Sequence, residues 1–282
     1  MTETKVPLTV RRTIAFSRAV YEGNAEVEHV TAKLTDGPEQ IDDRIKKGYI
    51  PLLVDSGLKY LKEYLKPGIT TKRLDTLAED FIISKGAIPS CKGFEGYPAT
   101  LCTSINEEVV HGIPSNRKLK NGDIITLDIC ACYKGYHGDS AWTYAIGDIS
   151  CDKEYLLEHT EKSLYEGLKQ VKPGNRIGDI SSAIEEYAKK HKLGVIKELE
   201  GHGIGTNLHE DPEVPNYGIK HTGPVLKKGM VIAVEPMLTL GSPEIVILDD
   251  DWTIETKDYS PSAHFEHTVV VTDDGCKILT GV

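Results

Sequence analysis

The chain has 282 residues, of which 39% are hydrophobic and 27% charged, proportions typical of a folded globular protein rather than a disordered one. Its formal net charge of −10 argues against a main role in coating nucleic acid, because binding to phosphates requires a basic surface. The longest apolar runs, such as 269–271, are too short to cross a bilayer, so we expect no membrane segment.

The first 38 residues show no clear periodicity, and we interpret them as an amino-terminal extension of unknown role. No secretory leader opens the sequence, and the acidic residues after Arg18 disfavour the alternative of an organelle transit peptide. We therefore predict a cytoplasmic protein with reduced cysteines. The main domain is expected over 39–282, beginning with a helix over 39–66 that Pro51 should kink or divide.

An internal repeat follows this helix. The tripeptide Lys-Pro-Gly occurs at 66–68 and again at 172–174, and each copy precedes apolar residues with helical spacing. These residues fall at the same offsets from their loops: Leu74, Leu77, Ala78, Phe81 and Ile82 in the first copy, and Ile180, Ala183, Ile184, Tyr187 and Ala188 in the second. The repeat predicts two similar halves, each with a helix followed by strands.

Alternating and apolar runs predict the strands. Residues 123–133 and 136–146 flank a Lys-Gly turn and form a predicted hairpin, and 230–239 and 263–272 are two further predicted strands. A helix over 154–171 joins the halves. Helices followed by antiparallel strands predict an α+β fold in which the helices back one curved sheet.

Three acidic residues stand inside these apolar strands, namely Asp128, Glu235 and Glu266. Burial of an ionised carboxylate costs several kcal/mol unless it is paired or binds a metal. A single such acid favours a structural salt bridge. Three of them, with no lysine or arginine in the same segments, favour a metal site.

Asp139 strengthens this interpretation, because the hairpin can place it on the same face as Asp128, directly opposite or diagonal. The Cβ atoms of such residues would lie about 5–8 Å apart, and their carboxylates suit two cations about 3.5–4 Å apart. A set of mainly oxygen ligands with one histidine suits Mn, Fe(II), Co or Zn. The six cysteines contain no CxxC pair, which argues against a thiolate zinc site.

Three of the ten histidines have suggestive surroundings. His202 stands among three glycines, where the backbone can approach a ligand closely. His209 follows it shortly, and His111 precedes a predicted turn. Each alone is more often a structural residue, and the other seven are interpreted as such. The chain has neither a GxSxG elbow nor a P-loop, so a serine hydrolase and an NTPase lose their main support.

Five separate segments closely resemble the type I methionine aminopeptidases. They occur in the order and at the spacing of that family: Ser104–Pro114, Tyr136–Asp139, Gly201–Gly205, Val234–Met237 and Phe265–Thr268. The resemblance runs from about residue 39 to the carboxyl terminus. It implies the pita-bread fold, in which two pseudo-symmetric α+β halves surround a dinuclear metal site, and makes 39–282 the catalytic domain.

The resemblance also implies roles for individual residues. The ligands of two divalent ions would be Asp128, Asp139, His202, Glu235 and Glu266, with Asp139 and Glu266 bridging both ions. His111 and His209 would bind the substrate and assist catalysis, and Glu235 would also shuttle a proton. Cys91, Tyr97, Cys102 and Trp252 would line the methionine pocket. The chain departs from the family at Leu208 and at Phe94-Glu95, which leaves the shape of that pocket open.

The implied activity is removal of the initiator methionine from nascent proteins whose second residue is small. The metal could be Co, Mn, Fe or Zn, and the protein is expected to be a monomer with transient ribosome contact and no specific nucleic acid. Two alternatives remain. One is a peptidase like prolidase or aminopeptidase P, and the other is a metal-free binding module on the same fold.

Overall fold

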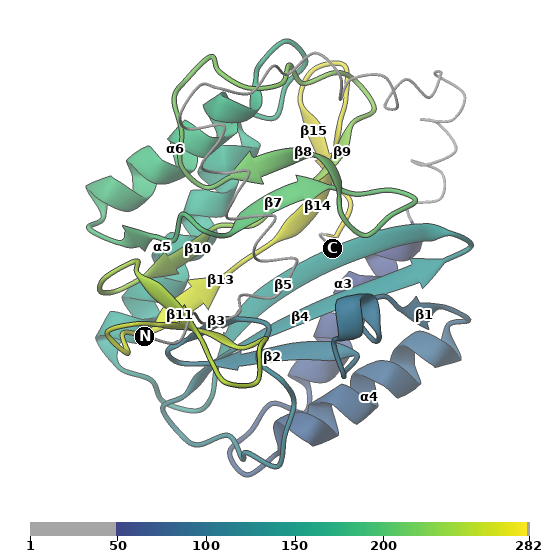
Figure 1. Ribbon diagram of the computed structural model, residues 1–282, viewed down its shortest axis with the longest axis vertical. Coiled ribbons are helices and arrows are strands. Elements are labelled where there is room, and N and C mark those ends of the chain that lie inside the picture. Colours follow the sequence, from purple (N-terminus) through teal and green to yellow (C-terminus); the bar gives the residue numbers. More distant parts are fainter. Residues whose placement is uncertain (1–48, 281–282) are drawn as a thin grey trace.

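The computed structural model describes residues 49–280 (Figure 1). The predicted extension over 1–38, its boundary with the main domain and the predicted helical residues 39–48 lie outside this range. Within it, α3 (Tyr49–Lys62) is continuous, and Pro51 lies in its first turn. A first-turn proline is tolerated because the N–H it lacks has no partner within the helix. Pro51 therefore does not divide the described helix.

The repeat predicted from the sequence is confirmed by two pairs of helices. α3 packs with α4 (Thr71–Ser84), and α5 (Cys151–Leu168) packs with α6 (Ile177–Lys190). α4 and α6 are both 14 residues long, and each begins at the third residue after its Pro-Gly turn. The two pairs occupy separate parts of the molecule, the first beside β4 and the second beside β10 and β13 (Figure 1).

The predicted hairpin consists of β4 (Ile124–Tyr133) and β5 (Tyr136–Ala145). β5 pairs with the whole length of β4. The short strands β1 (Ile88–Pro89) and β2 (Leu101–Ile105) pair with different parts of β4, at 131–132 and 125–129. Because β5 occupies one edge of β4, β1 and β2 lie end to end along the other edge. The loop between them carries the short helix η3 (Phe94–Gly96).

The second half contains a five-stranded sheet in the order β15-β14-β9-β7-β8. Its members are β7 (Glu200–Gly203), β8 (Glu210–Pro215), β9 (Val231–Val234), β14 (His267–Val271) and β15 (Cys276–Ile278). Two three-stranded sheets adjoin it. One contains β6 (Gly194–Val195), β10 (Met237–Thr239) and β13 (Ser262–His264), and the other β3 (Glu108–Val110), β11 (Ile245–Ile247) and β12 (Ile254–Thr256).

The predictions of continuous strands over 230–239 and 263–272 are wrong. Both are interrupted by two residues, Glu235-Pro236 in one and Phe265-Glu266 in the other. On one side of the breaks β9 pairs with β14, and on the other side β10 pairs with β13. The two breaks therefore lie opposite each other. The single curved sheet expected from the sequence is therefore divided, and the described strands form four sheets.

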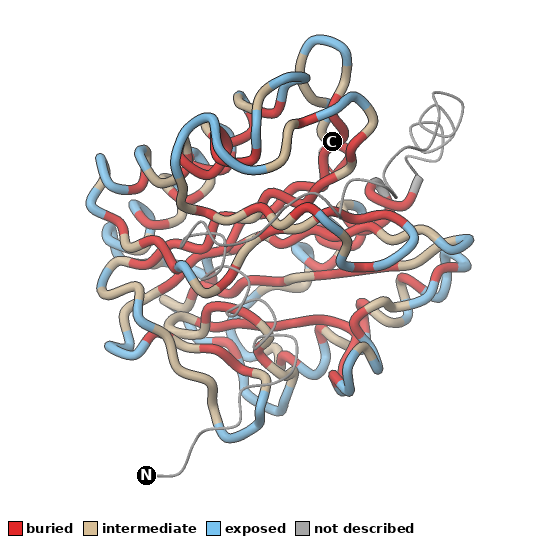
Figure 2. Tube along the Cα trace, turned by 45° about the horizontal axis from the view of Figure 1, so that its top comes forward, coloured by how far each residue is buried: buried red, intermediate tan, exposed pale blue. Residues whose placement is uncertain are grey.

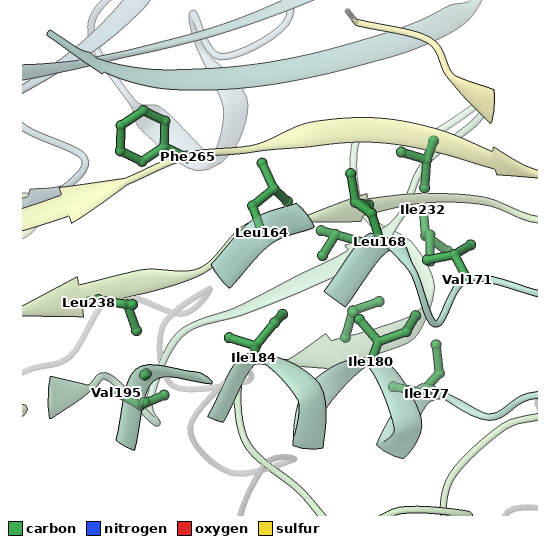
Figure 3. Close-up of a cluster of buried hydrophobic side chains, with 14 of the residues drawn as sticks. Leu164, Leu168, Val171, Ile177, Ile180, Ile184, Val195, Ile232, Leu238 and Phe265 are labelled. Atoms are coloured by element: carbon green, nitrogen blue, oxygen red, sulfur yellow. The ribbon is translucent and has the colours of Figure 1, made fainter. Parts of the chain in front are cut away.

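Each half has its own apolar core, and the strands between the helical layers are mostly buried (Figure 2). In the second half Leu164 and Leu168 of α5 meet Ile180 and Ile184 of α6, with Ile232 of β9 nearby (Figure 3). Full burial of such side chains contributes about 1.5–3 kcal/mol each, so these cores hold the strands rigidly around the site. No helix in the described part of the chain is long and apolar enough to cross a bilayer.

Candidate active site

The β4–β5 hairpin places Asp128 and Asp139 on one face, as predicted. Asp128 lies opposite Ala141, and Asp139 lies opposite Cys130, so the two acids are diagonal neighbours. The alternate residues of β4 point the other way into the first core, among them Leu127 and Ile129. The strand therefore buries its apolar face against the helices and turns its carboxylates toward the second half.

Glu235 and Glu266 occupy the two strand breaks, which corrects the expectation that they lie within strands. Paired strand residues flank the two breaks, Val234 with His267 on one side and Met237 with His264 on the other. The Glu266 N–H donates to the carbonyl of Ala141 at 2.9 Å, which ties the second break to the hairpin. Donor atoms of Glu235, Glu266 and His202 lie within 4.8 Å of one another. The breaks thus bring two acids from distant segments to one point.

His202 joins this cluster from β7. Its Nε2 lies 3.8 Å from Oδ2 of Asp139 and 3.6 Å from Oε1 of Glu235. Its Nδ1 lies 2.8 Å from the carbonyl of Gly203 and so carries the proton that this contact requires. Desolvation lowers the pKa of His202 to about 3, which keeps the ring neutral. A neutral imidazole whose Nε2 lone pair faces carboxylates is arranged as a metal ligand.

The glycines around His202 serve a different purpose from the one the sequence suggested. A Cβ on Gly201 would lie 2.4 Å from the carbonyl oxygen of Ala233, and one on Gly203 would lie 2.2 Å from that of Asp211. Both glycines therefore allow β7 to pack closely between its neighbouring strands. This close packing positions His202.

The acids repel one another in the absence of a cation. Burial, together with the neighbouring carboxylates, raises the pKa of Asp128 to about 8. Burial is the main cause that raises the pKa of Asp139 to about 7 and those of Glu235 and Glu266 well above their ordinary value. Oε1 of Glu266 is buried without a hydrogen-bond partner, and no lysine or arginine among the described residues forms an ion pair with these acids. Such a ligand set fits divalent cations, which would neutralise the charge.

These pKa values predict how pH affects the metal-free protein. A carboxyl group whose pKa is raised by folding contributes stability that is complete below its unfolded pKa and is lost as pH rises through its folded pKa. We therefore expect the melting temperature of the metal-free chain to fall as pH rises from about 4 through the Asp139 and Asp128 values of about 7 and about 8. Calorimetry with and without metal tests this, and a flat metal-free profile would contradict it.

The two predicted catalytic histidines lie close enough for His209 to influence the pKa of His111. Possible metal-binding atoms of His209, His202 and Asp139 lie within 4.8 Å of one another. His209 is therefore closer to the proposed ligands than we expected, because the resemblance implies no ligand role for it. Desolvation lowers the pKa of His209 and brings that of His111 to about 4. Both rings are therefore neutral at pH 7, and the buried Nδ1 of His111 is left without a hydrogen-bond partner.

The predicted methionine pocket is brought together beside this cluster. Cys91, Tyr97 and Cys102 are buried in one apolar cluster, and Trp252 packs against it. The Tyr97 and Trp252 rings meet edge to face at 5.1 Å. Two residues at which the chain departs from the family lie at the same place. Leu208 belongs to this apolar cluster, and the Phe94 ring meets the His209 ring edge to face at 5.1 Å.

Sequence reasoning missed two residues of the site. His264 was interpreted as structural, yet it is 1% exposed and its Nε2 lies 3.4 Å from Oε2 of Glu235. Neither ring nitrogen of His264 has a hydrogen-bond partner. Cys130 is also buried, and its thiol donates to Oδ1 of Asp139 at a sulfur–oxygen distance of 3.0 Å. Their signal in the sequence was the two-residue spacing from Glu266 and from Asp128 along a strand.

Buried and half-buried carboxylates with a neutral histidine, held between two repeated α+β halves and beside an apolar cluster, define a metallohydrolase. The comparisons with known proteins give the same class, because residues 51–273 match metallopeptidase family M24. Methionine aminopeptidase 1 of Bacillus subtilis is 54% identical over 222 residues, which cover 79% of this chain and 90% of the relative. The methionine aminopeptidase of Clostridium acetobutylicum is 50% identical over 229 residues, or 81% of this chain and 92% of that one.

Solved structures agree. The crystal structure of methionine aminopeptidase from Rickettsia prowazekii superposes with a TM-score of 0.85 at 39% identity, covering 88% of this chain and 100% of that chain. Prolidase from Pyrococcus furiosus superposes with a TM-score of 0.67 at 21% identity over 89% of this chain and 66% of its own, which is a likeness of fold alone.

The chain therefore belongs to metallopeptidase family M24 and, within it, to the methionine aminopeptidases. The pita-bread fold and the hydrolase class predicted from the sequence are confirmed, and the comparisons favour this interpretation over the prolidase alternative. The use of divalent metal follows from the family. The number and identity of the ions and the roles of single residues stay predictions.

Proposed function

We propose that the chain removes the N-terminal methionine of nascent polypeptides whose second residue is small. One observation carries this proposal: buried and half-buried metal-type ligands, which pair with no lysine or arginine in the described part of the chain, lie beside a cluster of cysteine and aromatic side chains. The relatives named methionine aminopeptidase support it. Such a pocket suits the flexible thioether of methionine, to which sulfur–aromatic contacts add a modest stabilisation.

We assign the metal ligands as the resemblance implies. Asp128 would hold one cation, His202 and Glu235 would hold another, and Asp139 and Glu266 would contact both. Two divalent cations, when bound, supply Lewis acidity and a nucleophilic water at neutral pH. Asp139 belongs to one group of possible ligands with Asp128 and to another with His202, which supports a bridging position.

The remaining groups act on the peptide. The neutral ring of His209 donates a hydrogen bond to the carbonyl oxygen as negative charge develops there, and His111 contacts the scissile nitrogen. Glu235 accepts a proton from the attacking water and passes it to the departing amine, as the resemblance implies. His264, at 3.4 Å from Glu235, limits the movement of that carboxylate.

Selectivity at the second residue tests the proposal. The peptide bond is held between His111, His209 and the acid cluster, so a long second side chain would displace the reacting carbon, and a shift of about 1 Å can cost about 10² in rate. We expect kcat/KM for Met-X-Ser tripeptides to be high when X is Gly, Ala, Ser, Thr, Pro, Val or Cys. It should fall at least about 10²-fold for Lys.

Leu-Ala-Ser is the control for the methionine pocket, and it should be a poor substrate. A flat profile across X would contradict the proposal and favour a broad aminopeptidase on the same fold. We place this activity in the cytoplasm, as the cysteine usage suggests, and the six cysteines include no disulfide among the described residues. Ribosome contact, a monomeric state and the role of residues 1–38 stay predictions from the sequence.

A further inference from the structure

Cys130 lies among the proposed metal ligands, although the sequence suggested no thiolate site. On β4 it follows Asp128 by two residues, so both side chains lie on the same face, and it is the direct partner of Asp139 on β5. Its Sγ lies 3.0 Å from Oδ1 of Asp139 and 3.8 Å from Oδ1 of Asp128. Cys130 is 4% exposed, and donor atoms of all three residues lie within 4.8 Å of one another.

We propose that Cys130 is a sixth ligand, a thiolate that binds the cation held by Asp128 and Asp139. The inference rests on the metal centre of the proposed function and adds a residue outside the five assigned ligands. Zinc–sulfur and zinc–oxygen bonds of about 2.3 Å and 2.0–2.2 Å place adjacent sulfur and oxygen ligands of one ion about 3–4 Å apart. The two sulfur–oxygen distances, 3.0 and 3.8 Å, lie in this range.

Coordination exchanges one bond for another without a change of oxidation state. The S–H bond of Cys130 breaks, its proton leaves to solvent, and the electron pair that remains on sulfur forms the bond to the cation. The hydrogen bond to Asp139 is lost in this step, which frees Oδ1 of Asp139 for the same cation. Cations make such deprotonation favourable, because a coordinated thiol is bound as its thiolate.

A thiolate in this position would change which metal the site prefers. Thiolate is a soft ligand, so it favours Zn²⁺, Co²⁺ and Fe²⁺ over Mn²⁺, which prefers carboxylate and water. A site made only of the five oxygen and nitrogen ligands would discriminate less between these ions. The apolar neighbours of Cys130 in the pocket wall, Ile204 and Leu208 among them, strengthen the contact by keeping water away from the sulfur.

X-ray absorption at the zinc edge of the full chain loaded with Zn²⁺ tests the proposal directly. We expect a sulfur shell at about 2.3 Å beside the nitrogen and oxygen shell at about 2.0–2.2 Å. With Co²⁺ the same ligand should give a sulfur-to-metal charge-transfer band in the near ultraviolet. Cys130→Ser should abolish both signals, because its hydroxyl can still donate to Asp139 but provides no sulfur.

Two variants are matched controls. Cys91→Ser removes a thiol from the same cluster, and Cys132→Ser removes the next alternate residue of β4; both should keep the sulfur shell. Cys130→Ser should weaken Zn²⁺ binding about 10- to 100-fold and Mn²⁺ binding far less, as measured by titration calorimetry.

The outcomes separate this inference from the proposed function. Zinc bound by wild type through nitrogen and oxygen alone would overturn the role of Cys130 and leave the five-ligand centre intact. Failure of both wild type and Cys130→Ser to bind any of these ions would overturn both proposals. Because the absorption spectrum of wild type decides the question, the test does not depend on the folding of the variant.

Discussion

Replacement of His209 with alanine is expected to lower kcat by about 10²–10³, the usual effect of losing one donor to a developing oxyanion. Desolvation lowers the pKa of His209, so the ring is neutral at pH 7 and donates one N–H without adding a charge. KM should change less than kcat, because the bond strengthens as the transition state forms. Steady-state kinetics with Met-Ala-Ser, together with metal analysis of the purified variant, provide the measurement.

Metal content decides the interpretation of this variant. His209 lies close enough to Asp139 and His202 to share a metal ion with them, yet we assign it a contact with the substrate. The alanine variant should therefore bind as much metal as wild type. Loss of metal along with activity would make His209 a ligand and overturn its assignment. His221→Ala is the control, because this histidine is exposed and lies beside Asp179, away from the site.

Replacement of Asp128 with asparagine should have opposite effects on the metal-loaded and metal-free protein. A neutral amide is a poorer ligand than a carboxylate, and we expect metal affinity to fall about 10²-fold or more, with activity lost in metal-limited buffer. In the metal-free chain the same change removes a half-buried carboxyl group whose pKa desolvation raises to about 8. Above that pH the variant should be the more stable of the two, since wild type must bury the charge.

Thermal melting with and without metal, at a pH above the Asp128 value, measures both effects. The metal-free variant should melt above metal-free wild type, and the order should reverse when metal is added. Asp249→Asn serves as a control at an exposed aspartate outside the site and should change neither curve. If the Asp128 variant bound metal as tightly as wild type, Asp128 would not be a ligand.

The amino-acid sequence by itself determined those parts of the molecule that depend on neighbouring residues. The repeated loops and the apolar phase after them predicted α4 and α6, because helical periodicity is a property of a short segment. The alternation around Asp128 predicted the β4–β5 hairpin and a shared face for Asp128 and Asp139, which the structure shows to be diagonal neighbours. The family resemblance then supplied the fold and the ligand set, which the residues alone supported only as a metal site of unspecified function.

The tertiary structure decided where strands end and which distant residues meet. Residues 230–239 and 263–272 are apolar enough to form continuous strands, but they divide at Glu235 and Glu266, where the chain passes from one sheet to the next. His264 reaches Glu235 only through pairing between segments distant in the sequence. Local periodicity carries no record of such pairing, because the contacts that fix it form between residues far apart in the chain.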